Sequence, residues 1–298
     1  MKKMQEDTIE IAGGSLQFIK ENGEVIITAF NGLVGEVRIP GEIADCPVTA
    51  IAKKAFLSKK NLRRVILPDS IREVGDWAFA YCDRLKEVEF PLADIRFGRS
   101  VFMECGALQS LSVRGKSEAV SQLLAAAVTT ACAPYLLQPE EAGDEKWLAK
   151  WDARMLTILH ADDTEGYSRQ VLCGEEDYGS TDLNAYTSGR RRIKVRLALL
   201  RLLYPEGLQD MVGRELSAYL QAHTKGCATE ETWLVVLEEM GDSKAYFELL
   251  TCLGCVSKDN FAAMLEDMGE DHPEMKAFLL RYQAEALSGD DFFDSLEL

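Results

Sequence analysis

The chain has 298 residues, 47% of them hydrophobic, and a formal net charge of −16 from 33 basic and 49 acidic side chains. This length exceeds one ordinary hydrophobic core, so we expect two domains. No apolar run reaches the roughly 18–20 residues that a membrane-spanning helix needs, and the acidic balance argues against general nucleic-acid binding.

The charge is unevenly distributed along the chain. Residues 1–115 carry 16 basic and 16 acidic side chains, so residues 116–298 carry the whole net charge of −16. This asymmetry predicts a first domain over residues 1–115 and a second, acidic domain over residues 116–298. No apolar segment follows the basic residues at the start, so we expect no signal peptide and a cytoplasmic location. A chain trimmed from an exported protein would instead belong at the cell surface or outside the cell.

The first predicted elements are short strands. Residues 15–30 alternate apolar and polar side chains around Asn22-Gly23, a strong signal for a two-residue hairpin turn. A further short strand is expected at residues 37–40.

One pattern then recurs three times between residues 55 and 113. Each copy has an apolar–Phe pair followed by L-x-x-V-x-L or a close variant, and aligned positions such as Phe56, Phe79 and Phe102 are 23 residues apart. A period in the twenties built on L-x-x-L-x-L is typical of a leucine-rich solenoid. We expect each L-x-x-V-x-L segment to be a strand, the Phe rings to stack on the opposite wall, and the hairpin to cap the array.

The alternation of side chains along these strands predicts a binding face. The positions between the core residues should point outward, and a solenoid commonly binds its partner on such a surface. The candidate binding residues are Arg64, Ile66, Glu87, Glu89, Ser110 and Ser112.

The repeats also resemble a known family. The run V-T-A-I-A-K-K-A-F, continued by N-L-R-R-V-I-L-P-D-S-I-R-E-V-G-D-W-A-F-A-Y-C, is similar to the BspA-type leucine-rich repeat of bacteria over residues 24–114. In the third copy, Val113 is followed by Arg114 rather than proline, as expected where the array ends. The resemblance implies a right-handed solenoid used for binding or adhesion, mostly on bacterial surfaces or secreted.

From Ser117 the apolar period changes to that of helices. Ser117 is expected to cap a helix over residues 118–131 that covers the last rung of the solenoid, and a long helix is expected over residues 144–160. Further helices are expected near residues 188–204, 208–223, 229–240, 242–253, 257–268 and 273–287. The fold class is therefore α+β, a leucine-rich-repeat β-solenoid followed by an all-α domain. That helical domain resembles ankyrin- or HEAT-like arrays and the helical parts of Firmicutes repeat proteins.

An acidic loop and a basic run stand close together in the helical half. The acidic loop, residues 175–182, is expected to pair with the basic run ten residues later, through arginine forks on carboxylates. A cation site in the loop and a phosphate site on the arginines are the alternatives. The residues of this predicted pair are Glu175, Glu176, Asp177, Arg190, Arg191 and Arg192.

The eight cysteines suggest neither a disulfide scaffold nor a metal site. Cys82 and Cys105 occupy the same position of successive repeats, where they either form a disulfide or fill the core as reduced thiols. The lone C-x-x-C at Cys252 and Cys255 has no second ligand pair, so we expect both thiols in the core at a helix end.

No phosphate loop, nucleophile elbow or metalloprotease motif is present in the sequence. We therefore expect a non-catalytic scaffold that binds protein partners, without cofactor or metal and without nucleic acid. Two alternatives remain open: a metal-binding or enzymatic protein that uses residues 175–182, and a bacterial surface adhesin.

Overall fold

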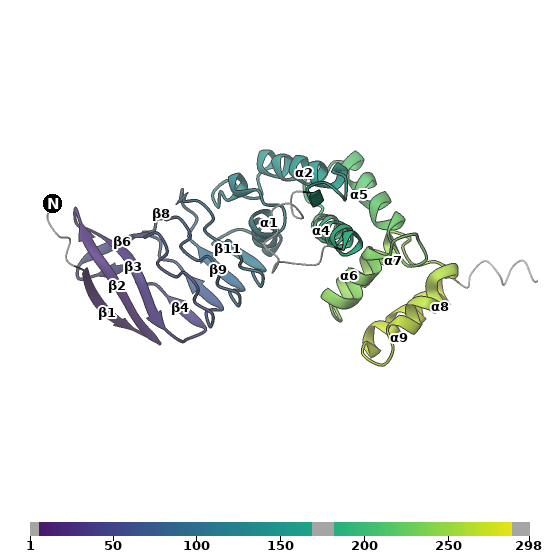
Figure 1. Ribbon diagram of the computed structural model, residues 1–298, viewed down its shortest axis with the longest axis horizontal. Coiled ribbons are helices and arrows are strands. Elements are labelled where there is room, and N and C mark those ends of the chain that lie inside the picture. The colour runs from purple at the N-terminus through teal and green to yellow at the C-terminus, as the bar shows by residue number, and fades with distance from the viewer. Residues whose placement is uncertain (1–5, 169–181, 288–298) are drawn as a thin grey trace, which may run out of the picture. The chain divides into compact units, whose positions relative to one another are not determined.

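The computed structural model describes residues 6–168 and 182–287 and divides into two compact units, Met1–Arg154 and Met155–Leu298. The first unit contains a β-solenoid and the helices that follow it, and the second unit is helical (Figure 1). The predicted α+β class, a solenoid followed by a helical domain, is confirmed. Over the residues described, none of the helices has the length and apolar character needed to span a membrane.

Three antiparallel strands precede the repeats: β1 (Glu6–Ile11), β2 (Gly14–Glu21) and β3 (Glu24–Gly32). The predicted hairpin is confirmed, and Asn22 and Gly23 have positive φ angles of 55° and 81°, as a tight two-residue turn requires. β1 was not predicted, because it contains only two apolar side chains. β3 also pairs in parallel with β6 (Cys46–Ile51), so this meander closes the first rung of the solenoid.

The L-x-x-V-x-L segments form one parallel sheet, here called the four-strand ladder. Its strands are β4 (Glu36–Arg38), β7 (Arg64–Ile66), β9 (Glu87–Phe90) and β11 (Ser110–Val113). Arg64 pairs with Glu87, and Glu87 pairs with Ser110. The register therefore advances by the 23-residue period from β7 to β11, whereas Glu36 on β4 pairs with Arg64, 28 residues later.

A second parallel ladder forms the next side of the solenoid. It consists of β6, β8 (Glu73–Val74) and β10 (Arg96–Phe97), while the short β5 (Glu42–Ile43) pairs antiparallel with β6. We did not predict β5, β8 and β10, because two-residue strands give no recognisable alternation. A Cβ atom on Gly98 would lie 2.4 Å from the backbone nitrogen of Asp76, so this glycine allows adjacent rungs to approach closely.

The third side carries the Phe residues in turns that we call the corners, residues 54–58, 77–81 and 100–104. Each corner begins and ends with a residue of positive φ, between 53° and 64°. The predicted aromatic spine is confirmed and is longer than expected, because Phe30 stacks on its first ring. The stacked rings are 5.4, 5.0 and 5.7 Å apart along the series Phe30, Phe56, Phe79 and Phe102.

Helices cover the C-terminal end of the solenoid. Ser117 accepts a hydrogen bond from the Val120 N–H and caps α1 (Glu118–Thr129), which packs on β11. The predicted helix over the last rung is confirmed. It is followed by the short helix η1 (Pro134–Leu136) and by α2 (Glu145–His160).

Two tryptophans of α2 join this helix to the solenoid cap. The Nε1 of Trp147 donates to the Leu136 carbonyl at 2.9 Å, and that of Trp151 donates to the Leu123 carbonyl at 3.1 Å. The compact units consequently divide between Arg154 and Met155, within α2. The predicted boundary at residues 115 and 116 instead marks the change from strands to helices.

The second unit contains the remaining helices. Their bounds are α4 (Leu183–Leu203), α5 (Asp210–Ala222), α6 (Glu231–Glu239), α7 (Lys244–Cys252), α8 (Lys258–Asp267) and α9 (Pro273–Tyr282), followed by a π-helical turn η2 (Gln283–Leu287). The expected helices are all present, with ends shifted by a few residues. α4 contacts α5, α6 and α7 and is the centre of this unit (Figure 1).

Candidate functional site

The outer face of the four-strand ladder carries the predicted binding residues. Glu87 and Glu89 on β9 and Ser110 and Ser112 on β11 are half-buried, and each alternates with a buried neighbour. Arg64 occupies the same face on β7. The ladder therefore brings residues from three repeats together on one surface.

Arg64 is the centre of an ion-pair network on this face. Its guanidinium lies 3.2 Å from the carboxylates of both Glu87 and Glu89 and 3.7 Å from that of Glu36. These carboxylates come from β4 and β9, the strands on either side of β7. Contacts on both sides restrict the Arg64 side chain, although it remains 39% exposed.

Three further hydrogen bonds extend the network toward the end of the ladder. The hydroxyl of Ser112 donates to Glu87 at 3.2 Å. Arg114 folds back across the strands, where its Nε donates to Glu89 at 3.0 Å and its Nη2 donates to the Leu67 carbonyl at 2.8 Å. The polar side chains of this face are thus held in place by one another.

Ile66 does not have the exposure expected for an outward position. Its side chain is only 1% exposed, and it lies in a groove of about 580 Å³ whose lining includes Arg38, Glu89 and Arg114. The long side chains on neighbouring strands cover it, because their aliphatic stems lie over apolar surface. Arg38 is exposed, and its side chain has no hydrogen-bond or ion-pair partner among residues 6–168 and 182–287.

The acidic residues predicted to pair with the basic run, Glu175, Glu176 and Asp177, lie outside the described residues. Within the described part, Arg191 donates to Asp163 at 2.7 Å and to Glu231 at 3.4 Å. The predicted contact between these arginines and the acidic loop stays a prediction.

Arg192 and Arg196 contact a different pair of carboxylates. Arg192 bonds Glu238 at 2.6 Å and Glu239 at 2.9 Å, and Arg196 contacts Glu239 at 2.5 Å. The two arginines lie one turn apart on α4, so both reach the C-terminal turn of α6. Arg190, the remaining member of the predicted set, has a buried Nε without a partner among the described residues.

A buried ion pair lies next to this cluster. Lys194 is 5% exposed and donates to Asp163 at 2.7 Å and to the Ala161 carbonyl at 2.6 Å. Burial opposes ionisation of Asp163, but the hydrogen bonds from Lys194 and Arg191 outweigh it and lower the pKa of this carboxyl. These contacts tie α4 to the loop that follows α2.

Cys82 and Cys105 are free thiols in the solenoid core. Each donates from Sγ to the carbonyl of a spine residue in the preceding corner, Cys82 to Phe56 and Cys105 to Phe79, both at 3.1 Å. Burial raises the pKa of Cys82 to about 11 and that of Cys105 to about 12. Of the two alternatives, the structure contains the reduced thiols.

The C-x-x-C pair is divided between core and solvent. Cys255 is 1% exposed, whereas Cys252, the last residue of α7, is exposed. The prediction that both thiols lie in the core is therefore wrong for Cys252. Across residues 6–168 and 182–287, no group of three His, Cys, Asp or Glu side chains could hold a metal ion.

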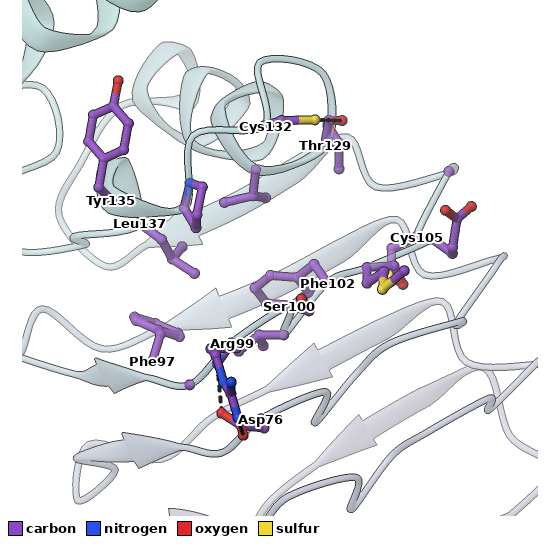
Figure 2. Close-up of a pocket in the computed structure, with 17 residues that line it drawn as sticks. Asp76, Phe97, Arg99, Ser100, Phe102, Cys105, Thr129, Cys132, Tyr135 and Leu137 are labelled. Atoms are coloured by element: carbon purple, nitrogen blue, oxygen red, sulfur yellow. Dashed lines mark hydrogen bonds and ion pairs between the residues drawn. The ribbon is translucent and has the colours of Figure 1, made fainter. Parts of the chain in front are cut away.

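A larger pocket, which the sequence did not predict, lies at the C-terminal end of the solenoid. Its volume is about 850 Å³. Figure 2 shows Phe97, Ser100 and Phe102 on the solenoid side and Cys132 and Tyr135 on the opposite side. We call it the end pocket. It arises because α1 covers β11 but leaves a gap over the last corner.

The rungs, the two parallel ladders and the stacked Phe column define the first unit as a leucine-rich-repeat solenoid. The family model for the BspA type leucine rich repeat region matches residues 39–124, in six copies. This part of the chain is therefore a BspA-type leucine-rich repeat region. A comparison with the curated proteins found no match.

Several solved structures are similar to the solenoid part of the chain. A leucine-rich repeat protein of T. pallidum is 29% identical over 35% of this chain and 48% of its own, with a TM-score of 0.31. A leucine rich cell surface protein of Faecalibacterium prausnitzii is 27% identical over 36% of this chain and 31% of its own, with a TM-score of 0.32. A leucine-rich repeat protein of Bacteroides ovatus is 27% identical over 35% and 28%, with a TM-score of 0.31. The matched part spans less than half the length of each of these proteins.

Proposed function

We propose that this protein is a non-catalytic scaffold whose protein partner docks on the outer face of the four-strand ladder. Leucine-rich repeat regions commonly serve as protein-interaction scaffolds, and the repeated geometry produces an extended surface suited to this use. The proposal assigns the binding contacts to Arg38, Arg64, Glu87, Glu89 and Ser112.

The observation that carries the proposal is the fixation of the polar side chains before any partner binds. Arg64 contacts three carboxylates from two neighbouring strands. Immobilising a long side chain at an interface costs about 0.5–1.5 kcal/mol. Because Arg64 is already held in place by these carboxylates, a partner that binds this face avoids part of that cost.

The groove beside the network indicates the chemistry of the partner. Pro40 and the exposed Pro47 provide apolar surface in the groove, and Arg38 is exposed without a described side-chain partner. A partner that places an apolar side chain beside these prolines and a carboxylate near Arg38 would match both features. Opposite charges placed in this way favour correct orientation and faster association.

The test is affinity capture from cells of the source organism with a variant of the face. Arg38→Glu combined with Ser110→Arg changes two charges on the face without removing a described ion pair. Arg84→Glu is the matched control, because Arg84 is exposed in the loop before β9 and outside the groove. We expect the face variant to lose partners that the wild type and the control capture, while circular dichroism shows all three proteins folded. Capture of the same partners by all three would refute the proposed face.

A further inference from the structure

Successive corners of the solenoid are joined by a repeating set of main-chain hydrogen bonds. In the first two corners, the N–H groups of the first, third and fifth residues each donate to the carbonyl just before the aligned residue of the next corner. The bonds from the second corner to the third are Trp77 to Arg99 at 2.9 Å, Phe79 to Val101 at 3.0 Å and Tyr81 to Met103 at 2.8 Å.

Three equivalent hydrogen bonds join the first corner to the second. They run from Lys54 to Asp76 at 3.0 Å, from Phe56 to Ala78 at 2.8 Å and from Ser58 to Ala80 at 2.9 Å. The donors step by 23 residues from rung to rung, and the acceptors do the same. The direction of these bonds is fixed, because each corner donates toward the C-terminal end of the array.

The last corner has no corner after it. Its corresponding donors are the N–H groups of Ser100, Phe102 and Glu104, and none of them has an acceptor among residues 6–168 and 182–287. All three residues line the end pocket. The array therefore ends with three main-chain donors on the wall of a cavity.

The helical cap covers the last rung only in part. Phe102 is 5% exposed, so its ring is covered, whereas Ser100 and Glu104 are exposed. Two apolar residues at the pocket are also exposed, Met103 at 43% and Tyr135 at 56%. An open row of main-chain donors beside apolar surface is the arrangement that recognises another polypeptide main chain.

We propose that the end pocket binds a peptide segment of a partner protein, which continues the solenoid by one corner. In that segment, three alternate carbonyls, the equivalents of those of Arg99, Val101 and Met103, accept from Ser100, Phe102 and Glu104. Its apolar side chains contact Met103 and Tyr135. The volume of about 850 Å³ lies within the usual range for ligand pockets.

A second copy of the chain does not supply this segment in the geometry shown. The opposite end of the solenoid is closed, because β3 pairs with β2 on one side and with β6 on the other. Stacking of two solenoids end to end would need to open that meander. The proposal is independent of the ladder face, since it uses other residues and main-chain rather than side-chain recognition.

The experiment uses a synthetic peptide with the sequence of residues 98–104, capped at both ends, because this segment accepts the same three bonds in the preceding rung. The full-length protein is labelled with ¹⁵N-phenylalanine. The N–H signal of Phe102 then reports a donor without an acceptor, and that of Phe79 reports the equivalent donor that is already hydrogen-bonded. In the free protein we expect the Phe102 N–H to exchange with solvent at least tenfold faster than the Phe79 N–H. Millimolar peptide should shift the Phe102 signal and slow its exchange, while the Phe79 signal remains unchanged.

Two controls distinguish main-chain pairing from nonspecific adhesion. A peptide with an ester in place of the amide after its fourth residue, the equivalent of Val101, has a weaker acceptor at the carbonyl that should pair with Phe102, and should bind several-fold more weakly. On the protein, Tyr135→Ala should weaken binding, whereas Leu92→Ala should not, because Leu92 is 56% exposed outside the pocket. Equal exchange at Phe102 and Phe79 in the free protein, or no shift at Phe102 with millimolar peptide, would overturn the proposal. Protection that depends on protein concentration without peptide would also overturn it, in favour of a second copy.

Discussion

The aromatic spine makes a quantitative prediction, because its rings differ in how many neighbours they have. Phe79 is fully buried between Phe56 at 5.0 Å and Phe102 at 5.7 Å, whereas Phe30 stacks on Phe56 alone, at 5.4 Å. An aromatic pair contributes about 0.5–1.5 kcal/mol beyond its buried area. Phe79→Leu should therefore lose two such contributions, about 2 kcal/mol, and Phe30→Leu one, about 1 kcal/mol. The smaller volume of leucine costs a similar further amount in both variants.

The measurement is urea unfolding of the full-length chain. Unfolding of the solenoid is monitored by the reaction of the buried Cys82 thiol with a labelling reagent, because this thiol becomes accessible only when the solenoid opens. The free energy of unfolding should fall by about 1 kcal/mol more for Phe79→Leu than for Phe30→Leu, close to a fivefold difference in the unfolding equilibrium. Equal losses would refute the idea that stability is summed over neighbouring rungs, as expected for a repeat array.

Two further predictions concern the second unit and the cysteines. Asp163→Asn should destabilise the protein by about 3 kcal/mol at neutral pH, because Lys194 would remain buried without its carboxylate. Urea unfolding measures this loss, and the control variant Asp162→Asn, at an exposed carboxylate next to it, should lose less stability. The pKa of Asp163 is lower in the folded protein than in the unfolded chain. Its contribution to the free energy of unfolding is therefore complete above the unfolded pKa of about 3.9 and is lost as the pH falls through the folded pKa. A loss of stability in Asp163→Asn that is the same at pH 7 and pH 3 would contradict this. With a chromogenic disulfide reagent at pH 7, exposed Cys132 should react in the native protein and Cys82 only after unfolding, because burial raises the pKa of Cys82 to about 11.

The repeat, the spine and the helices could be predicted from the sequence because each depends on local or periodic patterns. The period of 23 residues placed Phe56, Phe79 and Phe102 in one column and put Arg64 beside Glu87, as the register confirms. Capping residues such as Ser117 could also be predicted, because a cap bonds its own helix.

The errors concern contacts that sequence spacing does not encode. The burial of Ile66 depends on long side chains from other strands, and alternation alone cannot show it. Arg192 pairs with Glu239, 47 positions away, although acidic residues stand nearer in the sequence. The end pocket has a signal in the sequence: the apolar–Phe pair does not recur after Val101-Phe102, which leaves one set of inter-rung donors without acceptors.

The two surfaces of the solenoid differ in a way that follows from repetition itself. On the ladder face, a charged side chain of an inner strand has neighbours one rung before and one rung after, so Arg64 finds carboxylates on both sides and is neutralised within the protein. At the end of the array the next rung is missing, and no side chain of the last corner can replace the carbonyls that it would have supplied. Recognition at the face must therefore compete with contacts that already exist, which favours selectivity over affinity. Recognition at the end pocket displaces only solvent from Ser100, Phe102 and Glu104, so the binding of a short peptide there should depend more on its backbone conformation than on its charge.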